Sequence, residues 1–298
     1  MLVQITEKGT YLSKKSNRLV VKQSGKVQKE ISLDNVDVII LGKGIAFSSD
    51  LLVELCEAGI TIFFDFNNKY FVSSSSFLST PETRIKQINL SDDKKFFLAK
   101  GIIFTKVHNQ FSLLRSFGLN AEIDLSNPQN MNELLSFEAQ NAKNYWKNVR
   151  NLLGHQLFTS REPRKGDIVN SSLDYSYGII RNLVFKAVLN SGLDPYFGYI
   201  HQLKNYKPTM VFDIMEIFRP IADFTVISLL LEKEWESFAE IKYLLAKNLM
   251  KMIYSEFEYR NQKTSLFRIM SLQCFNIANY IAHDEKLEFF RVNEWKRL

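Results

Sequence analysis

The spacing of apolar residues changes once along this 298-residue chain, and that change constrains the fold more than any other feature. Before the serine run Ser73–Ser76, short β-branched segments are separated by turn formers such as Lys8-Gly9 and Ser24-Gly25. After it, apolar residues recur every three or four positions, which is the period of an amphipathic helix. The sequence therefore predicts a β-rich module followed by a helical one.

We expect an α+β protein with a small N-terminal β-rich domain (residues 1–80), a linker (81–95) and a larger all-α domain (96–298). Ser48 and its neighbours can cap one helix within the β-rich part, over residues 51–59. Strands are expected at residues 3–6, 11–12, 18–22, 27–33, 36–41 and 60–64. Helices are expected at residues 96–117, 131–153, 167–192, 211–231, 238–259 and 264–283.

The composition of the chain indicates which environment and which partners it fits. Hydrophobic residues make up 46% of the chain, and 38 basic against 32 acidic residues leave a net charge of +6, which permits a polyanionic partner without requiring one. Cys56 and Cys274 form no metal or disulfide motif and fit a reducing cytoplasm. Because the longest apolar run, near residues 225–231, is too short to cross a bilayer, we expect a cytoplasmic protein without a membrane partner.

One acidic residue lies on an apolar helix stripe. In the expected helix at residues 131–153, Glu138 falls four residues after Leu134 and four before Ala142, on the same face as Tyr145. A carboxylate on an inward face costs several kcal/mol unless it is paired, protonated or bound to a metal. An ion pair with an arginine of a neighbouring helix and a metal site both remain open.

A second group of acids interrupts the almost wholly apolar segment at residues 210–231. Asp213, Glu216 and Asp223 fall along one stripe of a helix, and two carboxylates one turn apart repel unless a cation lies beside them. That cation is either Arg219 or a metal ion. Pro220 is expected to kink the helix or to mark the start of one.

A histidine follows the turn-like residues between these acids. His201 ends the segment Gly198-Tyr199-Ile200-His201 and precedes a basic stretch at residues 202–207. A purely structural histidine is one explanation. The other is a site of carboxylates, one imidazole and nearby lysines, which suits a hard divalent ion with a phosphate ligand; Mg²⁺ or Mn²⁺ is preferred over zinc because no thiolate is offered.

Several motifs occur in a fixed order along the chain. They are Arg84–Gln87, Lys106–Gln110 with Leu113–Arg115, Phe137–Ala139 through Tyr145-Trp146, Asp167–Gly178, Gly198–His201 and Phe212–Pro220. In this order they resemble the CRISPR spacer-acquisition integrase, the family of CRISPR-associated protein one. The resemblance covers nearly the whole chain. It departs from the family at Ala139, where many relatives carry glycine.

The resemblance implies a site and a reaction. Glu138, His201 and Glu216 would be the ligands of Mg²⁺ or Mn²⁺, and Asp213 would shape the site. The reaction would be attack by the 3′-hydroxyl of a captured DNA fragment on a phosphodiester of a CRISPR repeat, which inserts spacers for antiviral defence. Two alternatives stay open: a stand-alone metal-dependent nuclease that repairs branched or single-stranded DNA, and a non-catalytic DNA-binding scaffold.

The resemblance also implies partners. These are double-stranded DNA fragments and CRISPR repeat DNA, a second copy of the chain bound through the β-rich domain, and the small second CRISPR-associated protein. Five basic residues are candidate phosphate contacts, although each could equally be an ordinary solvated charge: Arg161, Arg164, Lys165, Lys204 and Lys207.

Overall fold

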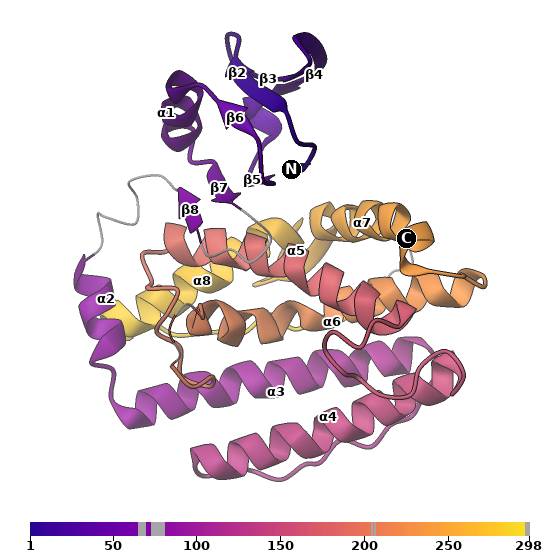
Figure 1. Ribbon diagram of the computed structural model, residues 1–298. Helices are drawn as coiled ribbons and strands as arrows, with labels where there is room; N and C mark the ends of the chain where they lie inside the picture. The colour runs from indigo at the N-terminus through magenta and orange to yellow at the C-terminus, as the bar shows by residue number, and fades with distance from the viewer. Residues whose placement is uncertain (65–69, 73–80, 204, 206, 296–298) are drawn as a thin grey trace. The chain divides into compact units, whose positions relative to one another are not determined.

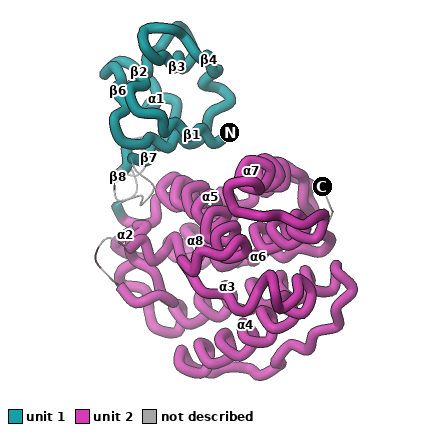
Figure 2. Tube along the Cα trace, turned by 45° about the vertical axis from the view of Figure 1, so that its right-hand side comes forward, with its two compact units in different colours: residues 1–81 teal, residues 82–298 magenta. Residues whose placement is uncertain are grey.

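The computed structural model describes residues 1–64, 70–72, 81–203, 205 and 207–295. It divides into two compact units, residues 1–81 and 82–298 (Figure 2). The serine run and the DNA-contact candidate Lys204 lie outside the described residues. In the part of the chain that is described, no helix combines the length and the apolar character needed to span a bilayer.

The first unit contains two four-stranded sheets. One has the strand order β1-β5-β7-β8, with β1, β5 and β7 parallel and β8 antiparallel; the other has the order β4-β3-β2-β6. The elements are β1 (Leu2–Ile5), β2 (Thr10–Lys14), β3 (Arg18–Gln23), β4 (Lys26–Ser32), the 3₁₀ turn η1 (Leu33–Asn35), β5 (Val38–Leu41), β6 (Ala46–Phe47), α1 (Ser49–Glu57), β7 (Thr61–Phe64) and β8 (Tyr70–Val72).

The core of the first unit follows from its central strand. All four residues of β5 are buried, as expected for a strand with neighbours on both sides and both faces covered. Helix α1 begins and ends two residues before the expected bounds of 51 and 59, and its N-cap is Ser48, as expected: the Ser48 side chain accepts a hydrogen bond from the backbone N–H of Leu51. Leu51 and Leu55 of this helix pack into the same core as Ile39.

The second unit is mostly helical, which confirms the expected fold class of a strand-rich part followed by a helical part. Its elements, shown in Figure 1, are α2 (Pro81–Ile88), α3 (Asp92–Ser116), α4 (Met131–Leu153), α5 (Ile168–Asn190), α6 (Thr209–Glu232), α7 (Phe238–Tyr254), β9 (Glu256–Tyr259), β10 (Gln262–Ser265) and α8 (Leu266–His283). The residues expected to form a linker, 81–95, thus hold α2 and the first turn of α3.

Helix α6 is the centre of the helical unit. It packs against α3, α4, α5 and α7, and nearly all of its residues are buried (Figure 1). The helix neither starts nor stops at Pro220, which lies in its interior. Because α6 is surrounded by other helices, each of its four charged residues up to Asp223 must find a partner inside the protein.

The expected helix at residues 238–259 ends five residues early, at Tyr254. Residues 256–265 form the antiparallel hairpin β9–β10 instead, so the helical unit is not wholly α. Arg260 and Asn261 make the two-residue turn with φ of 52° and 59°, the backbone conformation that such hairpin turns require. Alternation in Glu256–Tyr259 explains the strand, since the side chains of Phe257 and Tyr259 are more buried than those of the two glutamates.

An irregular C-terminal segment, residues 284–295, covers one face of α6. Its Phe290 ring stacks on Phe218 with centroids 6.0 Å apart, and its Trp295 ring lies 5.0 Å from that of Phe224. Buried Asn109 of α3 joins this segment to α6, because its amide donates to the carbonyls of Ile217 and Phe290. The C-terminal segment therefore helps to fix the position of the helix that carries the acidic residues.

Candidate metal centre

Three helices bring two glutamates onto one lysine. The Lys106 ammonium of α3 lies 2.5 Å from Glu138 Oε1 of α4 and 2.7 Å from Glu216 Oε2 of α6. Lys106 and Glu216 are buried, with side chains 9% and 4% exposed, whereas the Glu138 side chain is 25% exposed. Glu138 and Glu216 are the two carboxylates predicted to act together, and their oxygens next to Lys106 are therefore at most about 5 Å apart. The cation beside Glu138 is this lysine rather than the arginine that we considered.

Glu216 lies between two cations. Its Oε1 pairs with the Arg219 guanidinium at 3.0 Å, which confirms the arginine pair considered from the sequence. Burial raises the pKa of Glu216, but Arg219 and Lys106 outweigh that effect and lower the pKa to about 2. Burial lowers the pKa of Lys106, but the carboxylates of Glu216 and Glu138 outweigh that effect, so the pKa of Lys106 is raised. Glu216 and Lys106 are thus both ionised at neutral pH.

The ion pair of Lys106 and Glu216 is not a well-aligned hydrogen bond. Although the ammonium is within 2.7 Å of Glu216 Oε2, this buried oxygen accepts no hydrogen bond of acceptable geometry from any described residue. The positive charge of the ammonium nevertheless compensates this buried oxygen at 2.7 Å.

His201 is held by the buried carboxylate of Asp213. The His201 Nδ1 atom lies 2.6 Å from Asp213 Oδ1, and Asp213 also accepts backbone hydrogen bonds from Tyr199, Ile200 and His201. In the neutral imidazole, Nδ1–H donates to the carboxylate and Nε2 keeps a free lone pair, the arrangement typical of a metal-binding histidine. Gly198 is required here, because a Cβ at this position would come within 2.6 Å of Asp213 Oδ2.

The three acids expected on one stripe of α6 have three different roles. Asp213 holds the histidine turn, and Glu216 faces Lys106. Asp223 instead accepts hydrogen bonds from the Tyr145 hydroxyl, at 3.0 Å, and the Tyr177 hydroxyl, at 2.5 Å. The Asp223 carboxylate is therefore a structural group within the helical core.

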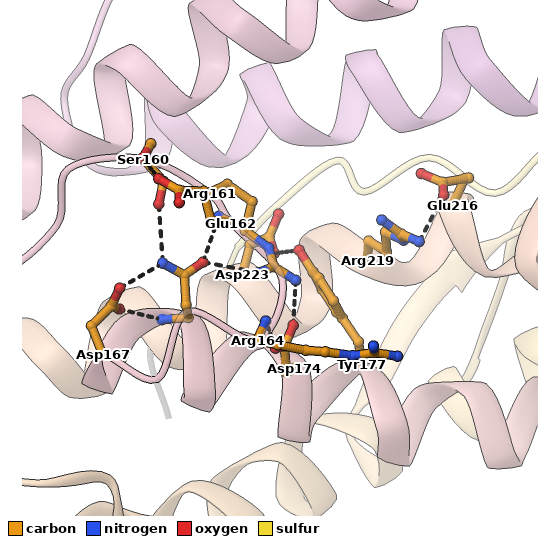
Figure 3. A network of polar contacts seen from close by, with 11 residues as sticks. Ser160, Arg161, Glu162, Arg164, Asp167, Asp174, Tyr177, Glu216, Arg219 and Asp223 are labelled. Carbon is orange, nitrogen blue, oxygen red and sulfur yellow. Dashed lines mark hydrogen bonds and ion pairs between the residues drawn. The ribbon is translucent and has the colours of Figure 1, made fainter. Parts of the chain in front are cut away.

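Figure 3 shows the polar contacts between the loop at residues 159–167 and α5, together with the Tyr177–Asp223 and Arg219–Glu216 pairs. Arg161 turns inward from this loop: its guanidinium pairs with Asp174 at 2.5 Å and lies 5.4 Å from the centre of the Tyr177 ring. Arg219 lies 5.0 Å from the same ring. Tyr177 is thus in contact with both the loop arginine and the arginine that holds Glu216.

The candidate DNA contacts differ in exposure. Arg161 has a side chain only 13% exposed and holds the loop on α5, so the structure does not present it as a surface cation. Arg164 and Lys207 are exposed, and Lys165 is exposed but pairs with Glu162 at 2.9 Å. The surface candidates among the described residues are therefore Arg164, Lys165 and Lys207.

The donor set fits a hard divalent ion. Two carboxylates and an imidazole oriented through Nδ1 are the oxygen and nitrogen ligands that Mg²⁺ or Mn²⁺ accepts. As the side chains stand, no three His, Cys, Asp or Glu residues of the described chain converge closely enough to hold an ion. The Lys106 ammonium is the cation that joins the two carboxylates instead.

The chain thus has a strand-rich unit followed by a helical unit, and the helical unit carries a cluster of acidic residues of the kind that binds a metal ion. The family model described as CRISPR associated protein Cas1 matches residues 3–259, and the chain belongs to this family. Members of the family are metal-dependent endonucleases, and the chain is a CRISPR-associated enzyme of this kind, with a role in spacer integration.

Individual proteins support the assignment. The CRISPR-associated endonuclease Cas1 1 of Francisella tularensis subsp. novicida is 29% identical over 96% of this chain and 98% of its own length. Among solved structures, a casposase bound to integration product has a TM-score of 0.82 at 18% identity, covering 99% of this chain and 96% of the casposase. A Cas1 protein from Thermotoga maritima has a TM-score of 0.77 at 18% identity, covering 99% and 100%. A partial Cas6-RT-Cas1–Cas2 complex has a TM-score of 0.67 at 15% identity, covering 99% of both chains.

The buried carboxylate of Asp223 predicts a pH dependence of stability. Burial raises its pKa from 3.8 to about 6, against the opposing hydrogen bonds of Tyr177 and Tyr145 and the charges of Arg219 and Arg161. Because the folded state then holds this proton more tightly than the unfolded chain, the contribution of Asp223 favours folding below pH 4. That contribution is lost as the pH rises through 6, by about 1.4 kcal/mol per pH unit and about 3 kcal/mol in all.

The Asp223→Asn variant isolates this effect, because an amide does not titrate. We expect the free energy of unfolding of the variant, relative to the unsubstituted protein, to increase by about 3 kcal/mol between pH 4 and pH 7. Urea unfolding at pH 4.0, 5.5 and 7.0 measures the difference. A difference that is the same at all three values would contradict the assigned titration.

Proposed function

We propose that this protein integrates captured DNA into a CRISPR array by joining the 3′-hydroxyl of a double-stranded fragment to a phosphodiester at the edge of a repeat. Glu138, His201 and Glu216 would hold Mg²⁺ or Mn²⁺ for this reaction. The observation that carries the proposal is the meeting of Glu138 of α4 and Glu216 of α6 on one cation inside the helical unit.

Each residue of the site would have its own task. Glu138 and Glu216 supply charged oxygen ligands. Asp213 orients the His201 ring so that its Nε2 atom points away from the Asp213 carboxylate. Arg219 fixes the direction of the Glu216 carboxylate through Oε1, which leaves Oε2 facing the Lys106 ammonium. When bound, the divalent ion supplies Lewis acidity toward the attacking hydroxyl and the phosphoryl oxygens.

DNA would be held by exposed cations of the helical unit. Arg164, Lys165 and Lys207 are the described candidates, and Lys204 remains a candidate from the sequence. Contacts of this kind are to phosphates, so they contribute affinity that depends on salt and not on sequence. Arg161 would act indirectly, by holding the loop that presents Arg164 and Lys165.

The protein would work in an assembly. A second copy of the chain, bound through the strand-rich unit, and the small second CRISPR-associated protein are the proposed partners. Two solved structures support this: one neighbour is described as a complex that contains Cas1 and Cas2, and another is bound to integration product. The exposed outer strand β4, in which five consecutive residues are exposed, is compatible with pairing between copies.

The Glu138→Gln variant tests the proposed reaction. We expect it to abolish the joining of a 3′-hydroxyl DNA end to a repeat-bearing plasmid in Mg²⁺ or Mn²⁺ with the partner protein present, because an amide is a poor ligand for a hard cation. Glu133→Gln is the matched control on the same helix: Glu133 is exposed and caps the start of α4, and glutamine can do the same. Circular dichroism confirms that both variants fold.

The outcomes separate the alternatives. Joining that persists at the normal rate in Glu138→Gln would reject the metal ligand. Cleavage of branched DNA that needs neither the partner nor a repeat would favour the stand-alone repair nuclease. DNA binding without joining or cleavage under any metal condition would favour the non-catalytic scaffold.

A further inference from the structure

The position of Lys106 is unusual for a metal centre. Its ammonium contacts both carboxylates that are proposed to hold the metal ion, at 2.5 and 2.7 Å. A divalent ion at its usual distance of about 2.1 Å from each carboxylate oxygen would need the space that this ammonium now fills. Lysine and metal ion therefore compete for the same two carboxylates.

Charge makes this competition strong. The two carboxylates of Glu138 and Glu216 are balanced by the two cations Lys106 and Arg219, so the cluster is neutral as it stands. A divalent ion added to a neutral cluster leaves two excess positive charges in a mostly buried place, which is unfavourable at low local dielectric. The excess is reduced if a phosphodiester arrives with the ion, because its oxygens bring negative charge.

We propose that Lys106 is a resident counter-ion that the metal ion must displace, and that it couples metal binding to the arrival of a DNA phosphate. This inference rests on the proposed function and extends it. Without DNA, Lys106 keeps the two carboxylates together and neutral, and the metal ion binds weakly. With DNA bound, the phosphate charge offsets the displaced ammonium, and the metal ion binds tightly.

Of the two carboxylates beside Lys106, Glu138 marks the side that is open to solvent. Glu216 is buried and held by Arg219, whereas the Glu138 side chain is the more exposed of the two carboxylates. The displaced ammonium therefore moves toward the Glu138 side of the cluster, where solvent and a DNA phosphate have access. Lys106 is a positioning residue, because it acts by placing its positive charge between the two carboxylates or by withdrawing it.

The test is a titration with Mn²⁺, followed by the electron paramagnetic resonance signal of the free ion, with and without a short duplex that carries 3′ single-stranded ends. For the unsubstituted protein we expect DNA to tighten Mn²⁺ binding at least tenfold, after subtraction of ions bound by DNA alone. For Lys106→Met and Lys106→Gln we expect Mn²⁺ without DNA to bind at least tenfold more tightly than to the unsubstituted protein. The gain from DNA should be correspondingly smaller.

Lys95→Met is the matched control, since Lys95 lies on the same helix and its ion pair among the described residues is with highly exposed Asp92. It should leave both affinities unchanged. Mn²⁺ binding that is equal or weaker in both Lys106 variants would overturn the counter-ion role while leaving the metal ligands intact. If the unsubstituted protein binds no Mn²⁺ with or without DNA, the proposed function itself fails, and the counter-ion role fails with it.

Thermal unfolding gives a second readout that does not depend on DNA. Lys106→Gln keeps a hydrogen-bonding side chain and should fold even if the methionine variant does not. We expect Mn²⁺ to raise its unfolding midpoint by more degrees than it raises that of the unsubstituted protein, because no bound cation has to leave. An equal or smaller rise would contradict the competition.

Discussion

Replacing Glu216 with glutamine is expected to lower the rate of DNA joining by about 1,000-fold, which corresponds to about 4 kcal/mol of transition-state stabilisation. The amide removes one charged ligand of the proposed ion. It also leaves the ammonium of Lys106 with a single carboxylate partner, Glu138. The effect should be the same with Mg²⁺ and Mn²⁺, since neither ion accepts an amide oxygen as readily as a carboxylate.

The free energy of unfolding should also depend on the residue at position 216, and alanine should lower it more than glutamine. Glu216→Ala strips Arg219 and Lys106 of a shared anion inside the protein, and breaking a buried pair in this way costs about 3–5 kcal/mol. Glu216→Gln keeps the shape and should cost less. Glu232→Gln, at the exposed end of the same helix, should change neither quantity. Urea unfolding and a joining assay on the three variants measure both effects. Normal joining by a folded Glu216→Gln variant would exclude Glu216 as a ligand.

The acids of this site were predictable because each violates a simple pattern. Glu138 interrupts the inward stripe of α4, and Glu216 interrupts a segment so apolar that it had to be buried. A charge at such a place needs a partner, and only a few partners are possible. Periodicity could therefore identify these residues, although it could not say whether the partner was an ion, an arginine or a lysine.

Lys106 carried the same signal and was missed as part of the site. It falls on the inward face of α3 together with Ile102, Ile103 and Leu113, so its position also violates the apolar stripe. A long side chain on such a stripe is easily read as one that extends to the surface, which lysine often does. What the sequence could not supply is the packing of α3 beside α4 and α6, because contacts between helices depend on side-chain shapes and not on period.

The hairpin at residues 256–265 was missed for a local reason. Phe257 falls four residues after Ile253 and so continues the helical spacing of α7, and the two-residue turn at Arg260-Asn261 lacks the glycine that usually marks such turns. The inward turn of Arg161 was missed because its anchor, Asp174, lies thirteen residues away. Charge clusters in loops indicate a surface only when no acid of a neighbouring helix is within reach.

Asp213→Asn is expected to have the second large effect, through two separable losses. The carboxylate accepts hydrogen bonds from the backbone of Tyr199, Ile200 and His201, and an amide nitrogen placed toward these donors would repel them. With this buried group unsatisfied, we expect a loss of about 3 kcal/mol in the free energy of unfolding. The His201 ring also loses its orientation, which should lower the joining rate about 10–100-fold.

A double-substitution cycle separates these losses. If Asp213 acts on the reaction only by orienting His201, then adding Asp213→Asn to a His201→Ala variant should reduce joining no further, while the loss of stability persists. Asp194→Asn is the matched control, because Asp194 accepts a backbone hydrogen bond from Tyr196 in the same turn region and touches neither His201 nor Asp213 in any described contact. Fully additive losses of joining rate would show that Asp213 contributes by a route other than the histidine, and its role would then have to include direct contact with the ion or the DNA.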